Sequence, residues 1–329
     1  DFTMKKNHNI TIFSLLFLLP ISFISAEEYK FGLGSCIHQD DPQPIWNSVK
    51  KDDINSFIFL GDNVYGDSAS LRLDKMAKAY AKQKKVFPLW LKEKEVLAIW
   101  DDHDYGKNDG GGEYRLKKEA QKLFVDFWDI PKNDIRQTRE GIYFNLIKNV
   151  DNLKINIIGL DTRYFRSELK GPKGNYIDNK DLDASMLGDA QWKWLSMVIN
   201  TESDLVVLLT SIQLLATEHQ YEKWSNFSLE RNKLISLIQA SGKQVIVISG
   251  DRHRGGIYKY KNIYELTASS MNKTASPVFE TDSLLIGETH FEENYGIMTI
   301  NTSDKVIKLI LKDKDGAILE SITTPISGH

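Results

Sequence analysis

Short apolar runs alternate with segments of helical periodicity along most of the chain. The runs are apolar on both faces, which is the pattern of strands buried on both sides of a sheet. They cover residues 29–36, 56–61, 95–100, 154–160, 204–210 and 244–249. Four segments carry apolar residues at three-to-four spacing and are predicted to be helices: 71–85, 116–128, 190–199 and 233–240. This alternation predicts an α/β protein.

Two regions depart from that alternation. Residues 141–147 and the run at 154–160 are separated by a short polar turn and are predicted to form a hairpin. After residue 256 the chain has strand-like segments with turns and no helical pattern between them, and Gly316 marks the turn into a last strand. The sheets are therefore expected to be mixed, with a late antiparallel part.

The N-terminal segment has the pattern of an export signal. Met4 is followed by Lys5 and Lys6, then by an apolar stretch over residues 10–24 that ends at Ser25-Ala26. We predict a signal peptide over residues 1–26, one domain over 27–329, and an exported protein, periplasmic or extracellular. The apolar stretch is short for a transmembrane helix, and a retained anchor is the alternative. Residues 1–3 precede the apparent start methionine and are interpreted as additions to the natural start.

Charge and cysteine content narrow the function. The net charge is −3 and the lysines are scattered among Asp and Glu, which argues against a nucleic-acid-binding stripe. A small anionic substrate therefore needs a local positive site. Cys36 is the single cysteine, so an internal disulfide is excluded. Its thiol is buried and inert, paired with another chain, or used in chemistry. The oligomeric state is not indicated.

Ligand-type side chains follow the ends of the predicted buried strands. In open α/β sheets the functional crevice lies outside the carboxyl ends of the strands, so these side chains are expected to meet at one edge. The clusters are Cys36, Gly61-Asp62-Asn63-Val64-Tyr65, Trp100-Asp101-Asp102-His103-Asp104, Asp161-Thr162-Arg163 and Ser249-Gly250-Asp251-Arg252-His253.

So many carboxylates in one crevice cannot all ionise unless cations lie between them. A thiolate with a phenolate favours a transition metal, and carboxylates accept that metal or a harder one. Two metals sharing one carboxylate would lie roughly 3.5–4 Å apart. Each cluster alone also has a plainer interpretation as a turn, a solvated loop or a buried core cysteine.

Taken together, these clusters resemble the PhoD-like alkaline phosphatase/phosphodiesterase family of the calcineurin-like metallophosphoesterase superfamily. The resemblance implies a four-layer αββα sandwich with two mixed β-sheets. It implies Fe³⁺ held by Cys36, Asp62, Tyr65 and His253, and Ca²⁺ held by Asp62, Asp102 and Asp251. Asp101 and Asn108 are further candidates for the metal shell or for substrate contact. The family commonly has Glu where this chain has Asp104, which leaves the role of that residue open.

The expected activity is metal-dependent hydrolysis of phosphoric esters, of the alkaline phosphatase/phosphodiesterase type, by in-line attack of a metal-bridging hydroxide. Arg163 is expected to bind phosphate oxygens, or else to form a salt bridge at the sheet end. His103 is expected to orient the phosphate or protonate the leaving oxygen, or else to hydrogen-bond a ligand carboxylate.

Two rival functions remain open at this point. One is a phospholipase-type phosphodiesterase with little monoesterase activity, because the loops around the pocket decide the substrate. The other is an exported metal-binding protein without catalysis. Residues 167–186 are expected to form part of the pocket rim. Trp224 and Phe227 are expected to form another part, with packing against a helix as the alternative.

Overall fold

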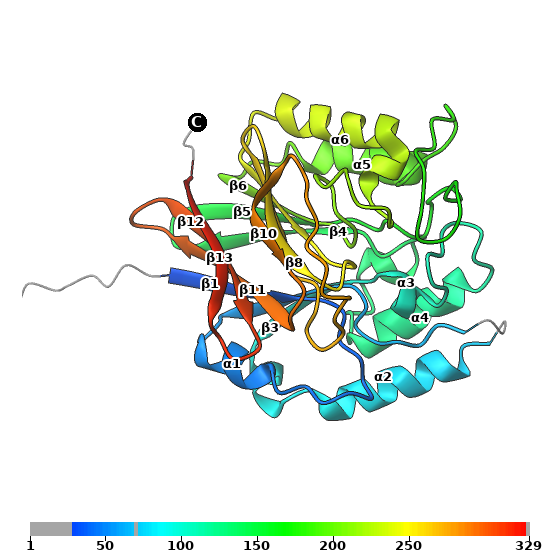
Figure 1. Cartoon of the computed structure of the whole chain (residues 1–329), viewed down its shortest axis with the longest axis horizontal. Coiled ribbons are helices and arrows are strands. Elements are labelled where there is room, and N and C mark those ends of the chain that lie inside the picture. The colour runs from blue at the N-terminus through cyan, green and yellow to red at the C-terminus, as the bar shows by residue number, and fades with distance from the viewer. Residues whose placement is uncertain (1–27, 69–71, 327–329) are drawn as a thin grey trace, which may run out of the picture.

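The computed structural model describes residues 28–68 and 72–326. In that part of the chain, two mixed β-sheets lie against one another between helices (Figure 1). The predicted α/β class and the αββα arrangement with two mixed sheets are confirmed. The predicted signal peptide, residues 1–26, lies outside the described residues, and the prediction of a single domain over 27–329 stays a prediction.

The first sheet has six strands in the order β13-β12-β11-β1-β2-β3. Its parallel part is formed by β1, β2 and β3, and its antiparallel part by the C-terminal strands. The bounds are β1 (Glu28–Gly34), β2 (Ser56–Leu60), β3 (Glu95–Ile99), β11 (Asn294–Asn301), β12 (Val306–Asp313) and β13 (Ile318–Pro325).

The second sheet has seven strands in the order β10-β8-β9-β7-β6-β5-β4. Parallel pairing runs through β5, β6, β7 and β9, and the strands at both edges are antiparallel. The bounds are β4 (Phe144–Val150), β5 (Leu153–Gly159), β6 (Leu205–Leu209), β7 (Val245–Ser249), β8 (Gly255–Tyr260), β9 (Ile263–Thr267) and β10 (Leu285–His290).

Helices cover the outer faces of both sheets (Figure 1). On one side are α1 (Trp46–Lys51), α2 (Asp74–Val86) and α4 (Lys117–Phe127). On the other are α5 (Gly188–Val198) and α6 (Ser228–Ala240). The short elements are α3 (Asp102–Tyr105), η1 (Leu89–Glu93), η2 (Ile135–Gln137) and η3 (Trp224–Phe227). In α2 the residues Met76, Ala79, Tyr80 and Gln83 are buried, so its three-to-four spacing forms the packed face.

The central strands are apolar in sequence because both of their faces are covered. Every residue of β2, β6 and β7 is buried. One apolar cluster contains residues from both sheets, including Phe57 and Leu209, and fills the space between them. A second cluster lies between the seven-stranded sheet and helices α5 and α6. The central core is therefore shared by the two sheets, and it fixes how their strand ends meet.

The aromatic pair assigned to the pocket rim was placed wrongly from the sequence. Trp224 is fully buried and Phe227 is nearly so, and both belong to the cluster under α5 and α6. The indole nitrogen of Trp224 donates to Thr210 Oγ1 at 2.9 Å, which anchors η3 to the end of β6. The alternative interpretation, packing beneath a helix, is the one observed.

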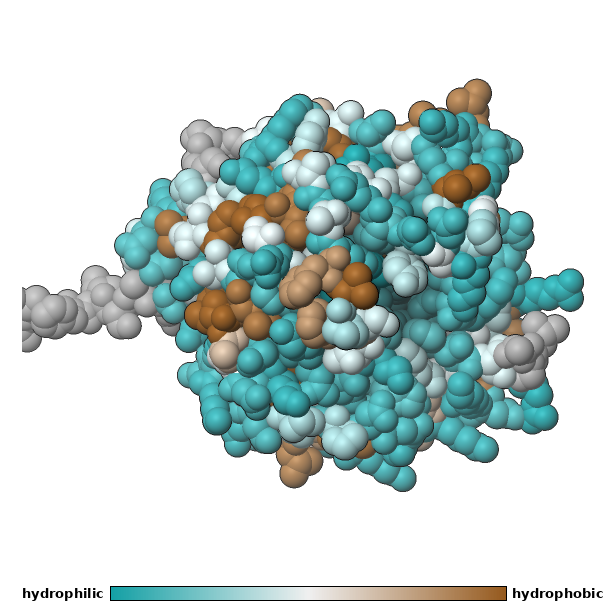
Figure 2. Space-filling view, viewed as in Figure 1, coloured by the Kyte–Doolittle hydropathy of each residue, from teal (hydrophilic) through white to brown (hydrophobic). Residues whose placement is uncertain are grey.

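The visible surface is mostly hydrophilic. In the view of Figure 2, hydrophobic residues form small groups separated by hydrophilic ones rather than one broad apolar face. Within residues 28–68 and 72–326, no helix is both long enough and apolar enough to span a membrane.

Replacing a leucine of the shared core should destabilise the fold strongly. Leu209→Ala in β6 removes a fully buried side chain and is expected to lower the free energy of unfolding by about 2–5 kcal/mol. The matched control is Leu182→Ala, because Leu182 is 95% exposed, and its expected change is within about 0.5 kcal/mol. Urea denaturation measures both. Equal effects of the two variants would show that the space between the sheets is not a packed core.

Candidate metal centre

The carboxyl ends of the parallel strands from both sheets meet at one place. The loops after β1, β2 and β3 come from the six-stranded sheet, and those after β5, β6 and β7 come from the seven-stranded sheet. Gly250 makes the close approach feasible, since an added Cβ would lie 2.6 Å from Ser35 Oγ and 2.9 Å from the Leu60 carbonyl oxygen. The sequence clusters are thus brought together by sheet packing rather than by sequence proximity.

A thiol, a carboxylate and an imidazole form the first group of metal-binding type. The ligand atoms of Cys36, Asp62 and His253 all lie within 4.8 Å of one another. Cys36 Sγ lies 3.5 Å from Asp62 Oδ2. Tyr65 completes the group, because its hydroxyl lies 3.4 Å from Asp62 Oδ2 and 3.3 Å from His253 Nε2.

Two further groups share residues with the first. Asp62 also groups with Asp102 and His103, and Asp102 in turn groups with Asp101 and Asp251. The six side chains expected to ligate metals therefore form one continuous cluster, with Asp62 and Asp102 as its shared members. Asp62 belongs both to the group that contains Cys36 and to the group that contains Asp102. Whether these residues ligate metals stays a prediction.

Four residues of this cluster have an unusual backbone conformation. The φ angles of Cys36, Asp62, Asp251 and His253 are 55°, 50°, 67° and 53°. These values lie in the left-handed region, which costs a residue with a Cβ roughly 1–2 kcal/mol. Strain of this kind gathers at functional sites, where side-chain placement outweighs backbone preference.

Burial opposes negative charge throughout the cluster. It raises the pKa of the Asp62 and Asp251 carboxyls well above the ordinary range, and nearby carboxylates raise both further. Burial likewise raises the pKa of the Cys36 thiol. It also raises the pKa of Asp101 to about 6, although the Arg163 guanidinium opposes the shift. Without additional cations, burial therefore favours the neutral forms of Asp62, Asp251 and Cys36.

Two carboxylate oxygens of the cluster have no hydrogen-bond donor among the described residues. Asp101 Oδ2 and Asp102 Oδ1 are buried and accept no hydrogen bond. Buried acceptors of this kind are costly unless a cation or a water satisfies them. Together with the thiol, the phenol and the imidazole, they form a donor set that fits a mixed site for a transition metal and a harder cation.

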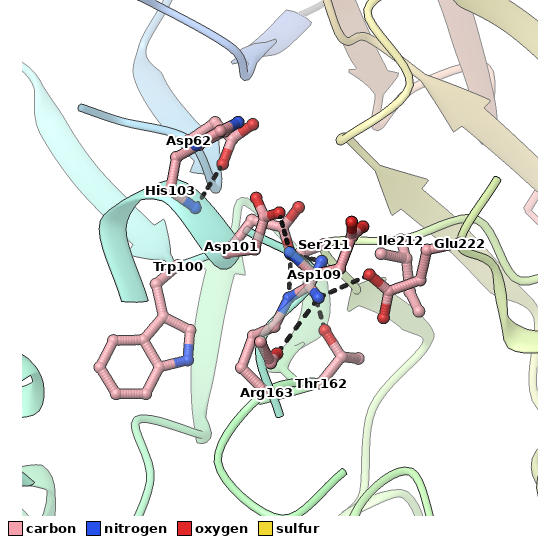
Figure 3. A network of polar contacts seen from close by, with 12 residues as sticks. Asp62, Trp100, Asp101, His103, Asp109, Thr162, Arg163, Ser211, Ile212 and Glu222 are labelled. Carbon is pink, nitrogen blue, oxygen red and sulfur yellow. Dashed lines mark hydrogen bonds and ion pairs between the residues drawn. The ribbon is translucent and has the colours of Figure 1, made fainter. Parts of the chain in front are cut away.

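Arg163 lies in an ion-pair network behind the cluster. Its side chain is fully buried, with Nε 2.6 Å from Asp101 Oδ1 and Nη1 2.6 Å from Glu222 Oε2. Figure 3 shows the guanidinium between these two carboxylates. Among the described residues that line the cavity, Arg163 does not appear. The structure thus shows Arg163 in the salt bridge that the sequence left as its alternative role, and its contact with phosphate oxygens stays a prediction.

The local sequence Asp161-Thr162-Arg163 explains how this arginine is held. Asp161 Oδ1 accepts from the Arg163 backbone N–H at 2.9 Å and from Trp100 Nε1 at 2.9 Å. Trp100 precedes Asp101 at the end of β3, so this contact joins the two sheets. Asp101, the partner of Arg163, is kept in register by the same contact.

His103 lies on the cavity next to the cluster. Its Nδ1 is 2.7 Å from Asp67 Oδ1, and its ring lies over Tyr65 with a centroid distance of 4.3 Å. Burial disfavours charge on this imidazole, but Asp102, Asp62 and Asp67 outweigh burial and raise its pKa to about 10. Asp67 fixes the ring through one nitrogen and leaves Nε2 for another partner.

The side-chain amide of Asn108 turns its nitrogen, and not its oxygen, toward the cluster. Its Nδ2 lies 3.3 Å from Asp102 Oδ2, while Oδ1 accepts from Lys173 at 2.9 Å. Asn108 lines the cavity, whereas Asp101 is fully buried beside it. Their assignment as additional metal or substrate residues stays a prediction.

Three residues support the cluster: Ser269 and Glu222 were not singled out from the sequence, and the role of Asp104 was left open. Asp104 accepts from the backbone N–H groups of Asp62 at 3.2 Å and Asp101 at 2.6 Å, which joins the two loops. Ser269 Oγ lies 3.3 Å from Cys36 Sγ and accepts from the His253 N–H at 3.0 Å. Glu222 holds Arg163. Of the three, only Asp104 could be noticed in the sequence, because it belongs to the run of polar residues that follows Trp100.

The cluster forms one wall of a cavity of about 820 Å³. Asp62, Asp102, His103, Asp251 and His253 line that wall. Other walls are formed by loops around residues 173–176, 218–222 and 274–281. The cavity can therefore bring a small molecule directly against the carboxylates and the imidazoles.

Comparison with known proteins agrees with this geometry. The chain is similar over 91% of its length to a purple acid phosphatase from yellow lupin seeds, with 11% identity, 54% of that chain covered and a TM-score of 0.61. It is similar over 92% of its length to GAP50 of Plasmodium, with 11% identity, 90% of that chain covered and a TM-score of 0.63. At this identity the likeness shows the fold alone. No curated protein sequence matches.

A family comparison is more specific. Residues 91–316 match the model of the PhoD-like phosphatases, and this range includes the clusters at Asp102, Arg163 and His253. It covers well over half of the chain, and metal ions belong to the chemistry of this family. The chain therefore belongs to the PhoD-like phosphatase family and is a hydrolase of phosphoric esters.

Proposed function

We propose that the protein is an exported metallophosphoesterase with an iron(III)–calcium centre. Cys36, Asp62, Tyr65 and His253 would hold the iron, and Asp62, Asp102 and Asp251 would hold calcium. The observation that carries this proposal is the chain of three metal-binding groups that share Asp62 and Asp102 on one cavity wall. When bound, the metals lower the pKa of a water molecule for in-line attack and neutralise charge on the ester oxygens.

The donor atoms support this division of metals. A thiolate, a phenolate and an imidazole suit a trivalent transition ion, whereas carboxylates alone suit calcium. Cys36 groups with Asp62 and His253, and the Tyr65 hydroxyl contacts His253, whereas Asp101, Asp102 and Asp251 form a group of carboxylates alone. A bridging Asp62 would serve both ions.

The residues of the chain position the ester and its leaving group. His103 is held through Nδ1 by Asp67, so Nε2 is available to orient a phosphate oxygen or to give a proton to the leaving oxygen. Arg163 acts at a distance, because its contact with Asp101 places a positive charge behind the carboxylates. Asp104 keeps the two loops that carry Asp62 and Asp101 in fixed register.

Export is the second part of the proposal. It is supported by Lys5-Lys6, the apolar stretch over residues 10–24 and the small residue Ala26. A lysine pair in place of two arginines favours export of the unfolded chain, with metals bound afterwards. Cys36 would then meet its metal outside the cytoplasm, where a single buried thiol has no disulfide partner in this chain.

Asp62→Asn should remove both metal and turnover. The amide cannot bridge two cations as a carboxylate can, so we expect a loss of bound metal and a fall in phosphoesterase turnover of about a hundredfold or more. Metal analysis and turnover of p-nitrophenyl phosphate and bis(p-nitrophenyl) phosphate measure the two effects. The control Asp126→Asn changes an exposed carboxylate in α4 and should leave both unchanged. Full activity of Asp62→Asn would support a metal-binding protein without catalysis.

The purified protein should contain iron and calcium and should absorb visible light. Charge transfer from the Cys36 thiolate or the Tyr65 phenolate to iron(III) gives the colour, and Tyr65→Phe should shift the band. Treatment with EGTA should abolish turnover, and added calcium should restore it. A colourless, iron-free and fully active enzyme would contradict the iron assignment. Unchanged turnover in EGTA would remove calcium from the proposal.

The exported protein should begin at Glu27. Expression of the full sequence in a bacterial host, followed by N-terminal sequencing of the secreted or periplasmic fraction, tests the predicted cleavage after Ala26. Replacing both Lys5 and Lys6 with Glu should retain the protein in the cytoplasm with residues 1–26 uncleaved. An intact N-terminus in the membrane fraction would instead support a retained anchor.

A further inference from the structure

The cavity extends beyond the metal-binding wall to a mouth formed by two loops. One contains residues 218–222 and the other residues 274–281. Most of the cluster side chains are buried, whereas three large apolar side chains at this mouth are exposed. Tyr221 is 52% exposed, Val278 is 60% exposed and Phe279 is 64% exposed. Exposed apolar groups gathered at the rim of a pocket mark a surface that binds something.

Arg252 connects both loops to the metal centre. It lies between Asp251 and His253 in sequence, and its side chain is only 5% exposed. Its Nη2 lies 2.6 Å from Glu280 Oε1, and its guanidinium carbon lies 4.7 Å from the centroid of the Tyr221 ring. One buried arginine thus contacts Tyr221 in the first loop and the neighbour of Phe279 in the second.

Backbone contacts hold the second loop close to the same strand end. The Ala275 N–H donates to the His253 carbonyl at 2.9 Å, and Arg254 Nη1 donates to the Val278 carbonyl at 2.6 Å. Phe279 also packs against Phe291 with a centroid distance of 5.7 Å. The loops that carry the apolar side chains are therefore held by Arg252, His253 and Arg254, which follow directly after Asp251.

We propose that Tyr221 and Phe279 bind a flat aromatic substituent of the phosphoric ester, namely the substituent that stays on the phosphorus when the leaving group departs. This inference rests on the proposed function and names its substrate class: diesters in which one substituent carries an aryl ring or a nucleobase. The metal wall takes the phosphate, and the rings at the mouth take the substituent that remains attached to it.

The charges around the mouth favour a flat ring over an acyl chain. Arg252 covers one face of the Tyr221 ring, while half of the Tyr221 side chain remains accessible. Rings stack on tyrosine and arginine planes and tolerate polar neighbours. An acyl chain would cover Glu218, which lines the same cavity, and would desolvate its carboxylate.

Four diesters with the same p-nitrophenolate leaving group test the proposal on the metal-loaded protein. Their second substituents are methyl, octyl, phenyl and 5′-thymidyl. We expect kcat/KM for the phenyl or the thymidyl ester, or both, to exceed that of the methyl ester by about tenfold, a factor typical of one stacked ring. The phenyl and thymidyl arms distinguish an aryl site from a nucleoside site.

Variants locate the effect. Tyr221→Ala should reduce the ratio of aromatic to methyl ester to about one, and Tyr221→Phe should retain it because the ring remains. Leu182→Ala, at an exposed leucine outside the cavity, should leave the ratio unchanged.

Three results would overturn the inference while leaving the proposed function standing. They are equal kcat/KM for all four esters, a preference for the octyl ester, and a ratio that persists in Tyr221→Ala. Hydrolysis of p-nitrophenyl phosphate but of none of the four diesters would also overturn only the inference. Hydrolysis of neither the monoester nor any diester by the wild-type protein would overturn the proposed function and this inference with it.

Discussion

Concentrated negative charge away from water is the constraint on which this structure depends. Asp62, Asp101, Asp102 and Asp251 lie in one buried cluster, and burial raises the pKa of Asp62 and Asp251 well above the ordinary range. Two positive groups lie beside this charge: Arg163 contacts Asp101, and the imidazole of His103, whose pKa these carboxylates raise to about 10, lies next to Asp62 and Asp102. One buried oxygen on each of Asp101 and Asp102 accepts no hydrogen bond. Cations between the carboxylates would both compensate the buried negative charge and coordinate the unpaired oxygens.

The fold provides that arrangement through two sheets rather than one. The six-stranded sheet carries Cys36, Asp62 and Asp102, and the seven-stranded sheet carries Asp251 and His253. Neither sheet alone holds a complete donor set. The apolar core between the sheets therefore has a functional consequence, because a shift of one sheet against the other would separate the thiol from the imidazole. The same packing maintains the left-handed backbone conformation of four cluster residues.

The sequence predicts those parts of this arrangement that depend on residues close together in the chain. The apolar runs that become β2, β6 and β7 are recognisable because both faces of each strand are buried. Gly61-Asp62 and Gly250-Asp251 are visible as small residues and carboxylates that follow such runs. Contacts between residues far apart in the chain have no such local signal. Glu222 pairs with Arg163 from an irregular loop 59 residues further along the chain. The edge strand β10 carries no clear signal in the sequence, because its exposed and buried positions do not alternate. Trp224 was assigned to the pocket rim because aromatic residues with polar neighbours in sequence are often exposed at pockets. In the structure it packs beneath helices.

The central claim is that two different metals share Asp62. Crystals of the metal-loaded protein, with diffraction data collected above and below the iron absorption edge, test it directly. The account predicts an anomalous peak that depends on the iron edge, bounded by Cys36, Asp62, Tyr65 and His253. It predicts a second peak without that dependence beside Asp62, Asp102 and Asp251. An iron peak on the Asp102 side, or a single metal that does not contact Asp62, would contradict the account.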